Sequence, residues 1–268
     1  MVPTYHRPTD VTEAVQLKAT LGEGAVYLAG GTEVNNLHGP RPAALIDLAG
    51  LGLGRIETTP EGLRLGAGVT FQQLIEHPDV PDFLRAAARQ MTNRNIRNRA
   101  TVGGHLATNR SCADLIPALL AASATVARVD GDWPLEQLLD SPPDLILAVF
   151  VPVTTRGFGL GHQTRTAADV SIVTAAASLT LEGEALRLPI LAVGGVAPHV
   201  VRLHEVEQAL DGRPLPVLEE LERRIAAAVH PLDDLRGSAA YKRQIAAVLG
   251  ARALQTAVHR FLSAEGAR

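Results

Sequence analysis

Cysteine is almost absent from this chain of 268 residues, in which Cys112 is the only one. A single thiol cannot form a disulfide within the chain, and it cannot ligate an iron–sulfur cluster without cysteines from elsewhere. Arginines close to Cys112 could lower the pKa of its thiol. The simpler interpretation, which we favour, is an ordinary small side chain.

Aromatic residues, excess positive charge and long apolar runs are also scarce. Aromatics make up 3% of the chain, so a bound ring would have to stack on few aromatic rings or on aliphatic side chains. The net charge of −3 argues against a partner that is a nucleic acid. No apolar run is long enough to cross a bilayer, and residues 1–8 contain no apolar segment of signal-peptide length. We therefore expect a cytoplasmic protein that does not enter a membrane.

The sequence motifs of several enzyme classes are missing. No His-x-His, Glu-x-x-His or His-Glu-x-x-His spacing occurs, so we expect no metal site. A Gly-x-Ser-x-Gly hydrolase motif is absent, as are a Gly-x-Gly-x-x-Gly motif and a Walker sequence. These absences disfavour hydrolase, Rossmann and P-loop proteins.

Three short apolar runs end in a Gly-Gly pair, namely Gly30-Gly31, Gly103-Gly104 and Gly194-Gly195. Because glycine lacks a Cβ, such a pair after a strand lets the backbone turn sharply and approach another group closely. Backbone N–H groups that converge in the turn can bind phosphate. The first two pairs lie about 70 residues apart and together could hold a long anionic ligand such as a dinucleotide. Each pair taken alone is equally compatible with a plain turn between a strand and a helix.

The hydrophobic pattern predicts a chain of mixed helices and strands in two domains. Apolar periodicity and capping residues indicate helices over residues 9–21, 71–75, 82–92, 114–122, 216–229 and 238–262. Short apolar runs between turn signals indicate strands over residues 25–29, 44–47, 55–57, 63–66, 125–129, 145–151, 170–181 and 185–193. The first part is β-α-β-like and predicts a small parallel unit. A composition shift over residues 152–157 places the domain boundary there.

A few polar residues near the Gly-Gly pairs could carry chemistry. Thr32 could donate its hydroxyl and its N–H to a phosphate. Asp114 could accept hydrogen bonds from a ribose or a ring N–H, or it could simply cap the helix that it precedes. His105 and His162 are the nearest histidines, and a lone histidine is more often structural than catalytic. The spacing alone leaves these alternatives open.

Several segments resemble one known family, in order along nearly the whole chain. Residues 29–32, 96–107 and 114–120 resemble the FAD-binding (medium) subunit of molybdenum hydroxylases, the family of xanthine dehydrogenase and carbon monoxide dehydrogenase flavoproteins. In the second half, residues 193–198, 202–207 and 235–243 resemble the C-terminal domain of the same subunit. The likeness is strongest to short bacterial flavin subunits of xanthine or hypoxanthine hydroxylases.

The resemblance implies an α+β fold that binds FAD. Two α/β subdomains, about 1–50 and 51–155, would form an FAD-binding (PCMH-type) domain over residues 1–155. A three-stranded antiparallel sheet with helices would follow in a C-terminal domain over 156–268. The cofactor-binding residues that the resemblance implies are Ala29, Gly30, Gly31, Thr32, Glu33 and Val34 on one side of the pyrophosphate; Thr101, Gly103, Gly104 and His105 on the other; Asp114 at the ribose or flavin end; and Ile146 or Leu147 near the rings.

Some positions depart from the family pattern. His105 stands where relatives usually carry Asn, and Ser111-Cys112-Ala113 stands where they often have a Ser-Pro pair, which implies a retuned flavin pocket. His162 occupies a position where many relatives carry lysine near the flavin, while Arg165 and Asp169 match the family.

The resemblance further implies an electron-relay subunit with no catalytic residue and no metal of its own. A molybdopterin-binding large subunit and a [2Fe-2S] small subunit, on separate chains, would deliver electrons to its FAD, and NAD, a quinone or oxygen would accept them. One alternative is a self-contained flavin oxidoreductase that uses His105 or His162 as its acid or base. Another is a flavin-poor assembly module. The intact glycines at both loops argue against this alternative.

Overall fold

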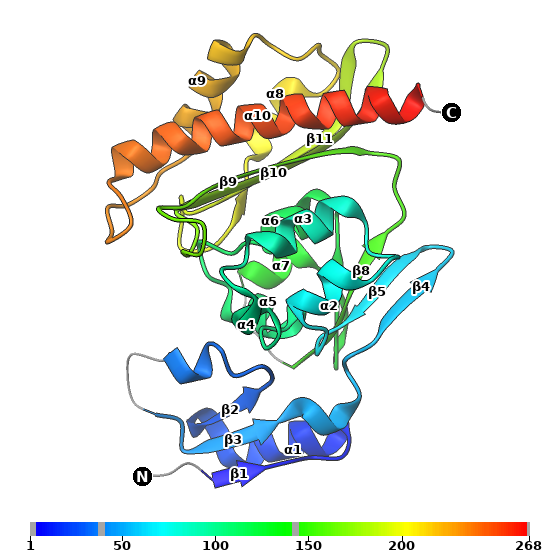
Figure 1. The fold of residues 1–268 in the computed structure, drawn as a ribbon, viewed down its shortest axis with the longest axis vertical. Helices are drawn as coiled ribbons and strands as arrows, with labels where there is room; N and C mark the ends of the chain where they lie inside the picture. Colours follow the sequence, from blue (N-terminus) through cyan, green and yellow to red (C-terminus); the bar gives the residue numbers. More distant parts are fainter. Residues whose placement is uncertain (1–3, 37–40, 141–144, 267–268) are drawn as a thin grey trace.

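Three sheets, each covered by helices, follow one another along the long axis of the molecule (Figure 1). The computed structural model describes residues 4–36, 41–140 and 145–266. Within these ranges no helix combines the length and the apolar character that crossing a membrane requires.

The N-terminal unit is a three-stranded parallel sheet in the order β1-β3-β2, with one helix packed on it. Its elements are β1 (Thr4–His6), α1 (Val11–Leu21), β2 (Ala25–Leu28) and β3 (Ala44–Asp47), with short 3₁₀ turns at Gly22–Gly24, Val34–Asn36 and Leu48–Leu51. Asp10 caps α1 by accepting a hydrogen bond from the amide of Glu13. The predicted parallel unit is therefore present. Strand β1 was not predicted, because three residues are too few to show a periodicity.

The middle unit is an antiparallel sheet of five strands in the order β4-β5-β8-β6-β7. Its strands are β4 (Ile56–Thr59), β5 (Gly62–Gly66), β6 (Thr125–Arg128), β7 (Gly131–Pro134) and β8 (Ile146–Pro152). Its helices are α2 (Phe71–Glu76), α3 (Asp82–Gln90), α4 (Arg94–Arg97), α5 (Val102–Thr108), α6 (Ile116–Ala121) and α7 (Leu135–Leu139). Strand β7 is exposed along its length, so it lacks the alternation that would have predicted it.

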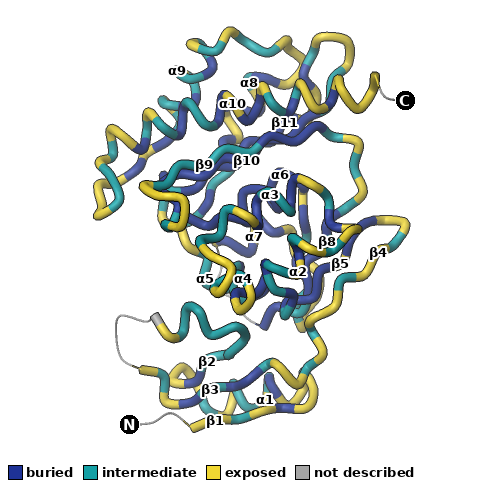
Figure 2. Tube along the Cα trace, in the orientation of Figure 1, coloured by how far each residue is buried: buried dark blue, intermediate teal, exposed yellow. Residues whose placement is uncertain are grey.

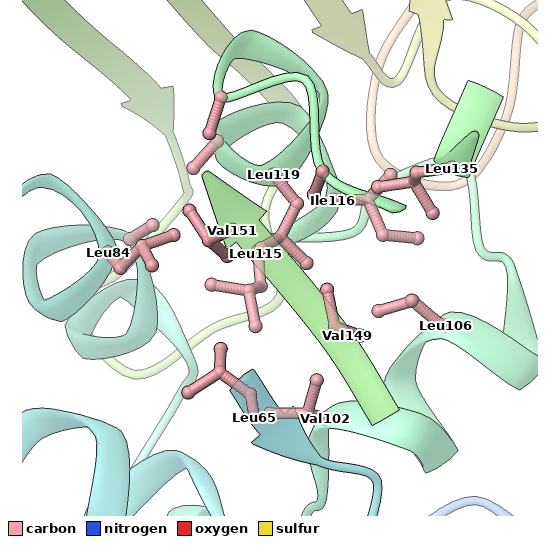
Figure 3. Close-up of a cluster of buried hydrophobic side chains, with 14 of the residues drawn as sticks. Leu65, Leu84, Val102, Leu106, Leu115, Ile116, Leu119, Leu135, Val149 and Val151 are labelled. Atoms are coloured by element: carbon pink, nitrogen blue, oxygen red, sulfur yellow. The ribbon is translucent and has the colours of Figure 1, made fainter. Parts of the chain in front are cut away.

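Apolar side chains from strands and helices form the core of this middle unit (Figure 3). Leu65 on β5 and Val149 on β8 are fully buried beneath the helices. Leu106 on α5 and Leu119 on α6 reach the same cluster from the helical side. Burial of each such side chain contributes about 1.5–3 kcal/mol. This packing holds α5 and α6 in place, and α5 and Asp114, just before α6, contribute to the cavity described below.

The C-terminal unit is an antiparallel sheet in the order β12-β11-β10-β9, covered by the long helix α10 (Figure 1). Its strands are β9 (Gly157–Gln163), β10 (Val173–Glu182), β11 (Ala185–Gly194) and β12 (Val201–Arg202), and its helices are α8 (His204–Leu210), α9 (Leu218–Ala228) and α10 (Ala239–Glu265). The expected three antiparallel strands are β9, β10 and β11. The two-residue strand β12 extends the sheet at one edge.

Strand β10 is buried on both of its faces, and Figure 2 shows it as part of a buried layer. Val173, Ala175 and Ala177 belong to the apolar cluster shared with α10. Because side chains alternate along a strand, Thr174 and Ser178 face the opposite side, toward α6. The second half of the chain therefore packs directly on the middle unit.

Phe158 on β9 shows the same continuity between the two halves. Its ring stacks on that of Phe83 in α3, with centroids 3.8 Å apart and planes 2° from parallel. Phe158 also belongs to the core of the middle unit. The domain boundary near residue 156 stays a prediction.

Alternate glycines on β9 allow α10 to lie close to the sheet. A Cβ at Gly159 would overlap the carbonyl oxygen of Ala253 on α10, and one at Gly157 would overlap that of Ala257. A residue with a side chain at either position would push the helix away from the strand. These glycines also explain why β9 was not predicted from its sequence.

We expect Gly159→Ala to lower the free energy of unfolding by about 1–3 kcal/mol, because the new methyl group collides with backbone that cannot move independently. Gly24→Ala is the control, since its Cβ would meet only the Cβ of Ala43, at 3.4 Å. That change should cost less than about 0.5 kcal/mol. Urea unfolding of both variants measures the difference, and equal losses would contradict the proposed contact.

Candidate functional site

One cavity of about 1110 Å³ lies between the N-terminal unit and the middle unit. Its walls come from β2 and the loop that follows, from the stretch between Met91 and Asp114, and from the start of β8. The cavity is large enough for an extended cofactor, because typical small-molecule sites enclose about 300–1,000 Å³. The predicted cofactor residues that line it are Ala29, Gly30, Gly31, Thr32, Glu33, Val34, Thr101, Gly103, Gly104, His105, Asp114 and Ile146.

Two residues offered by the sequence analysis are not among the described residues lining the cavity: Leu147, the alternative to Ile146, and His162. His162 lies on β9, opposite Thr174 of β10, and is half-buried. Burial lowers the pKa of its imidazole. Arg165 and Asp169, a short way along the chain, form an ion pair with a nitrogen–oxygen distance of 2.7 Å.

The first Gly-Gly pair forms a turn after β2, as expected, and its two glycines have different roles. Gly31 has φ of +75°, a left-handed conformation that favours glycine. Gly30 is needed for a close contact, because a Cβ there would overlap the carbonyl group of Arg99. The Arg99 guanidinium in turn donates a hydrogen bond from Nε to the carbonyl oxygen of Gly30 at 3.2 Å. Two loops from different units are thereby joined at the cavity wall.

This first loop presents backbone amides that are available to a ligand. Within the described part of the chain, the amides of Gly30, Gly31 and Glu33 donate to no acceptor. The amide of Asn35 does donate, to the carbonyl oxygen of Gly31 at 3.1 Å. The Glu33 carboxylate forms an ion pair with Arg110, which offsets the negative charge beside these amides. Clustered N–H groups of this kind suit an anion such as phosphate.

The second Gly-Gly pair differs from the expectation of a turn after a strand. Thr101 caps α5, and its hydroxyl oxygen accepts a hydrogen bond from the amide of Gly104 at 3.1 Å. The amides of Val102 and Gly103 donate to the carbonyl oxygens of Val69 and Ala67, both at 2.8 Å. These three amides are therefore engaged within the protein, and backbone donation from them to a phosphate is not available.

The two glycines of α5 are distinguished by what surrounds them. A Cβ at Gly103 would lie 2.5 Å from the Cβ of Ala67, so this glycine allows the helix to pack against that segment. A Cβ at Gly104 would approach only the hydroxyl oxygen of Thr101, at 2.9 Å. Since Gly104 lines the cavity, its missing side chain leaves room for a ligand rather than for protein.

His105 is held in the cavity wall as a neutral imidazole. Burial lowers its pKa to about 4. The amide of Leu115 donates a hydrogen bond to its Nε2 at 3.3 Å, so the proton of the neutral ring lies on Nδ1. The ring of Phe71 meets it edge-on, with centroids 5.0 Å apart. His105 thus connects α5 to the segment that precedes α6.

Asp114 immediately precedes Leu115, the residue that bonds to His105. Its carboxylate is buried, with 7% of the residue's surface exposed. It does not cap α6, whose N-cap residue is Leu115 and which has no side-chain cap. The hydroxyl of Ser171 donates to its Oδ1 at 2.6 Å. Burial raises the pKa of Asp114 to about 6, and the bond from Ser171 acts in the opposite direction. No described residue donates to its Oδ2.

The third Gly-Gly pair supports the site without lining the cavity. Gly195 has φ of +84°, and its amide donates to the carbonyl oxygen of Ser111 at 2.7 Å. A Cβ at Gly194 would lie 2.7 Å from the same oxygen. The hydroxyl of Ser111 donates to the carbonyl oxygen of Ala197. The C-terminal unit therefore fixes the loop that leads to Asp114.

Cys112 also lines the cavity, but its chemistry is that of an ordinary small side chain. Burial raises the pKa of its thiol, although Arg236 and Arg110 act to lower it. The Arg236 guanidinium donates from Nη1 to Sγ at 3.2 Å. The thiol therefore stays protonated at neutral pH.

Sequence reasoning missed part of the cavity wall. Examples are Lys18, Leu53, Gly68 and Thr70. Lys18 belongs to an amphipathic helix and would be read as a surface residue, yet its Nζ donates to the carbonyl oxygen of Ala25 at 2.6 Å. No spacing in the sequence brings these residues to the Gly-Gly loops. In the described ranges no group of His, Cys, Asp and Glu side chains could hold a metal ion.

The low pKa of His105 predicts a pH-dependent stability. Between about pH 6.5 and 4 the unfolded chain binds a proton at this residue that the folded chain does not, so its contribution to stability falls as the pH falls. Compared with His105→Gln, the wild type should lose up to about 1.4 kcal/mol of unfolding free energy per pH unit in this window. Urea unfolding across the window measures this. His259→Gln, at an exposed residue of α10, is the control, and identical profiles for both variants would contradict the prediction.

Comparisons with known proteins agree along the chain. Residues 2–154 match the family model described as the FAD binding domain in molybdopterin dehydrogenase, and residues 162–257 match the CO dehydrogenase flavoprotein C-terminal domain. YgfM of Escherichia coli (strain K12) is 33% identical over 253 residues, which cover 93% of this chain and 94% of that protein. The xanthine dehydrogenase FAD-binding subunit of Escherichia coli O157:H7 is 28% identical over 280 residues, covering 95% and 96%.

A solved structure extends the agreement to the fold. It is carbon monoxide dehydrogenase from Hydrogenophaga pseudoflava, in a form that lacks the Mo-pyranopterin moiety of the molybdenum cofactor. The TM-score is 0.89 at 27% identity, and the match covers 97% of this chain and 99% of that chain. Since one family model spans more than half of the sequence and a relative above 30% identity spans nearly all of it, the chain belongs to the FAD-binding medium subunits of the molybdenum hydroxylases, a family of oxidoreductase subunits whose cofactor is FAD.

Proposed function

We propose that this protein holds FAD in the cavity between its N-terminal and middle units and relays electrons through it. The observation that carries the proposal is that both glycine loops, Asp114 and Ile146 line one continuous cavity, although they are far apart in the sequence. The residues also fit the group, because the cavity offers unengaged amides, an open surface and a buried carboxylate with one unpaired oxygen.

We assign the pyrophosphate of FAD to the first loop. The amides of Gly30, Gly31 and Glu33 are the available donors, and the left-handed conformation of Gly31 shapes the turn that presents them. The ion pair between Glu33 and Arg110 keeps the loop from repelling an anion. Gly104, on the facing wall, leaves space for the cofactor to pass.

We assign the flavin end of the cofactor to Asp114 and Ile146. Asp114 can accept a hydrogen bond at Oδ2 from a hydroxyl or a ring N–H, since Ser171 already occupies Oδ1. Ile146, at the start of β8, supplies an aliphatic surface against which rings can pack. An aliphatic contact suits a protein with so few aromatic residues.

When bound, FAD supplies the redox chemistry, and the chain itself binds and orients it. We propose that electrons arrive from [2Fe-2S] clusters on a small partner subunit, which receives them from a molybdopterin-binding large subunit. NAD is one candidate for the final acceptor. The names of the similar proteins, a xanthine dehydrogenase FAD-binding subunit and carbon monoxide dehydrogenase, support this assignment.

A self-contained flavin oxidoreductase is less well supported by the geometry. It would need an acid or a base beside the ring, and only His105 and His162 were candidates. His105 is neutral, and its Nε2 already accepts the amide of Leu115. His162 is outside the described cavity lining.

The first test is the visible absorption spectrum of the purified protein, with the released cofactor identified by chromatography. We expect about one FAD per chain. A colourless protein that also fails to take up added FAD would favour an assembly module and would overturn the proposed cavity. If FAD is bound, bleaching by NADH tests the acceptor: rapid bleaching supports an NAD-linked relay, and its absence argues for a quinone or oxygen.

We expect Gly31→Val and Gly104→Val each to reduce FAD retention at least about tenfold. Valine at position 31 strains a left-handed residue, and valine at position 104 projects into space assigned to the cofactor. The flavin-to-protein absorbance ratio measures retention, and thermal unfolding checks that both variants fold. Ala264→Val, on an exposed face at the end of α10, is the control. Normal FAD content in both glycine variants would overturn the loop assignment.

A further inference from the structure

Ser171 reaches the candidate site from the C-terminal half of the chain. It immediately precedes Ile172 and β10, and no part of it is exposed to solvent. Its hydroxyl donates to Oδ1 of Asp114, 57 residues earlier in the sequence, at 2.6 Å. A buried hydroxyl bonded to a buried carboxylate is a specific arrangement, because each group would be costly to bury alone.

Two further hydroxyls from β10 bond to the same segment in a different way. Thr174 donates to the carbonyl oxygen of Ala113 at 3.1 Å, and Ser178 donates to that of Ala121 at 2.6 Å. Both satisfy backbone groups and so anchor the loop and α6. Ser178 also accepts a hydrogen bond from Nε of Arg156 at 2.9 Å, and of these three hydroxyls only that of Ser171 donates to a carboxylate.

We propose that Ser171 is a positioning residue for FAD, which holds the Asp114 carboxylate ionised and oriented so that Oδ2 accepts a hydrogen bond from the cofactor. The inference rests on the proposed FAD site. An ionised carboxylate only accepts hydrogen bonds, whereas a protonated one also donates. The donors at the flavin end of FAD are the ribityl hydroxyl groups and the ring N–H, and the ionised form of the carboxylate can accept from them.

The other described groups around Asp114 do not stabilise its negative charge in place of Ser171. His105 and Cys112 are both neutral at pH 7, since burial lowers the pKa of the imidazole and raises that of the thiol. Arg110 is paired with Glu33, and Arg236 donates to the Cys112 sulfur. No described cation forms an ion pair with Asp114, so the Ser171 hydroxyl is the group that stabilises its charge.

The decisive variants are Ser171→Ala, Ser171→Thr and, as a matched control, Thr174→Val. Thr174→Val removes a hydroxyl that bonds to the carbonyl oxygen of Ala113, next to Asp114 in the sequence, but not to the carboxylate. FAD affinity is measured by fluorescence titration of the apo protein from pH 5 to 8. Thermal unfolding of each variant verifies the fold.

Wild-type affinity for FAD should fall as the pH drops through about 6, because the carboxylate becomes protonated. In Ser171→Ala that fall should move up by about one pH unit, which weakens binding about tenfold at pH 5 and about twofold at pH 7. Ser171→Thr should restore the wild-type profile. Thr174→Val should leave the position of the fall unchanged.

A second readout does not involve FAD at all. The ¹³C shift of the Asp114 carboxyl carbon, followed in the apo protein, should titrate at higher pH in Ser171→Ala than in the wild type. Asp114→Asn identifies the resonance and should remove the pH dependence of binding.

These experiments distinguish a failure of the proposed function from a failure of the inference about Ser171. A wild type that does not bind FAD would overturn the proposed function and this inference with it. A wild type that binds, with the same pH profile in Ser171→Ala, would overturn this inference alone. An equal shift in Thr174→Val would assign the effect to packing and would also overturn it.

Discussion

Strand β10 is buried on both faces, and much of the structure depends on how its polar side chains are satisfied. One face packs on α10 through Val173, Ala175 and Ala177. The other face carries hydroxyls toward the middle unit, where leaving them unpaired would cost about 1–3 kcal/mol each. Thr174 and Ser178 therefore bond to backbone carbonyls of the segment between residues 113 and 121. The loop that carries Asp114 is thus held by a sheet formed much later in the chain.

The cavity owes its shape to a second contact, between the two glycine-containing walls. Gly30 lets the first loop touch the backbone of Arg99, and Arg99 donates back to Gly30. This contact joins the N-terminal unit to the middle unit at the place where the cofactor is proposed to lie. The backbone amides differ between the two walls. In the described part of the chain, those of Gly30, Gly31 and Glu33 donate to no acceptor, whereas those of Val102, Gly103 and Gly104 at the start of α5 are engaged. We therefore expect the first loop to bind the anion, and Gly104 on the opposite wall to leave space for it.

Several ionisable groups around the cavity are paired, neutralised by burial or bonded to backbone carbonyls, as Lys18 and Arg99 are. Glu33 is paired with Arg110, and His105 and Cys112 are both held neutral. Asp114 is a buried carboxylate that forms no ion pair with a described residue, and one hydroxyl, that of Ser171, stabilises its charge. Such a group titrates near neutral pH and responds to the loss of a single hydrogen bond. We therefore expect the site to respond to pH, and to the loss of one hydrogen bond, chiefly through the ionisation of Asp114.

The α+β class, the parallel N-terminal unit, the family and twelve of the residues that line the cavity could be predicted from the sequence alone. These rest on local signals, namely apolar periodicity and the glycine-containing motifs. The folded structure was needed to show that Gly103 packs against Ala67, whereas Gly104 leaves room in the cavity. It was also needed to show that Asp114 bonds to Ser171 instead of capping α6. It also placed Lys18 in the cavity wall and left His162 outside the described lining. The physical reason is that these roles depend on which groups meet in the folded chain, and a contact such as that between Asp114 and Ser171, 57 positions apart, leaves no local pattern in the sequence.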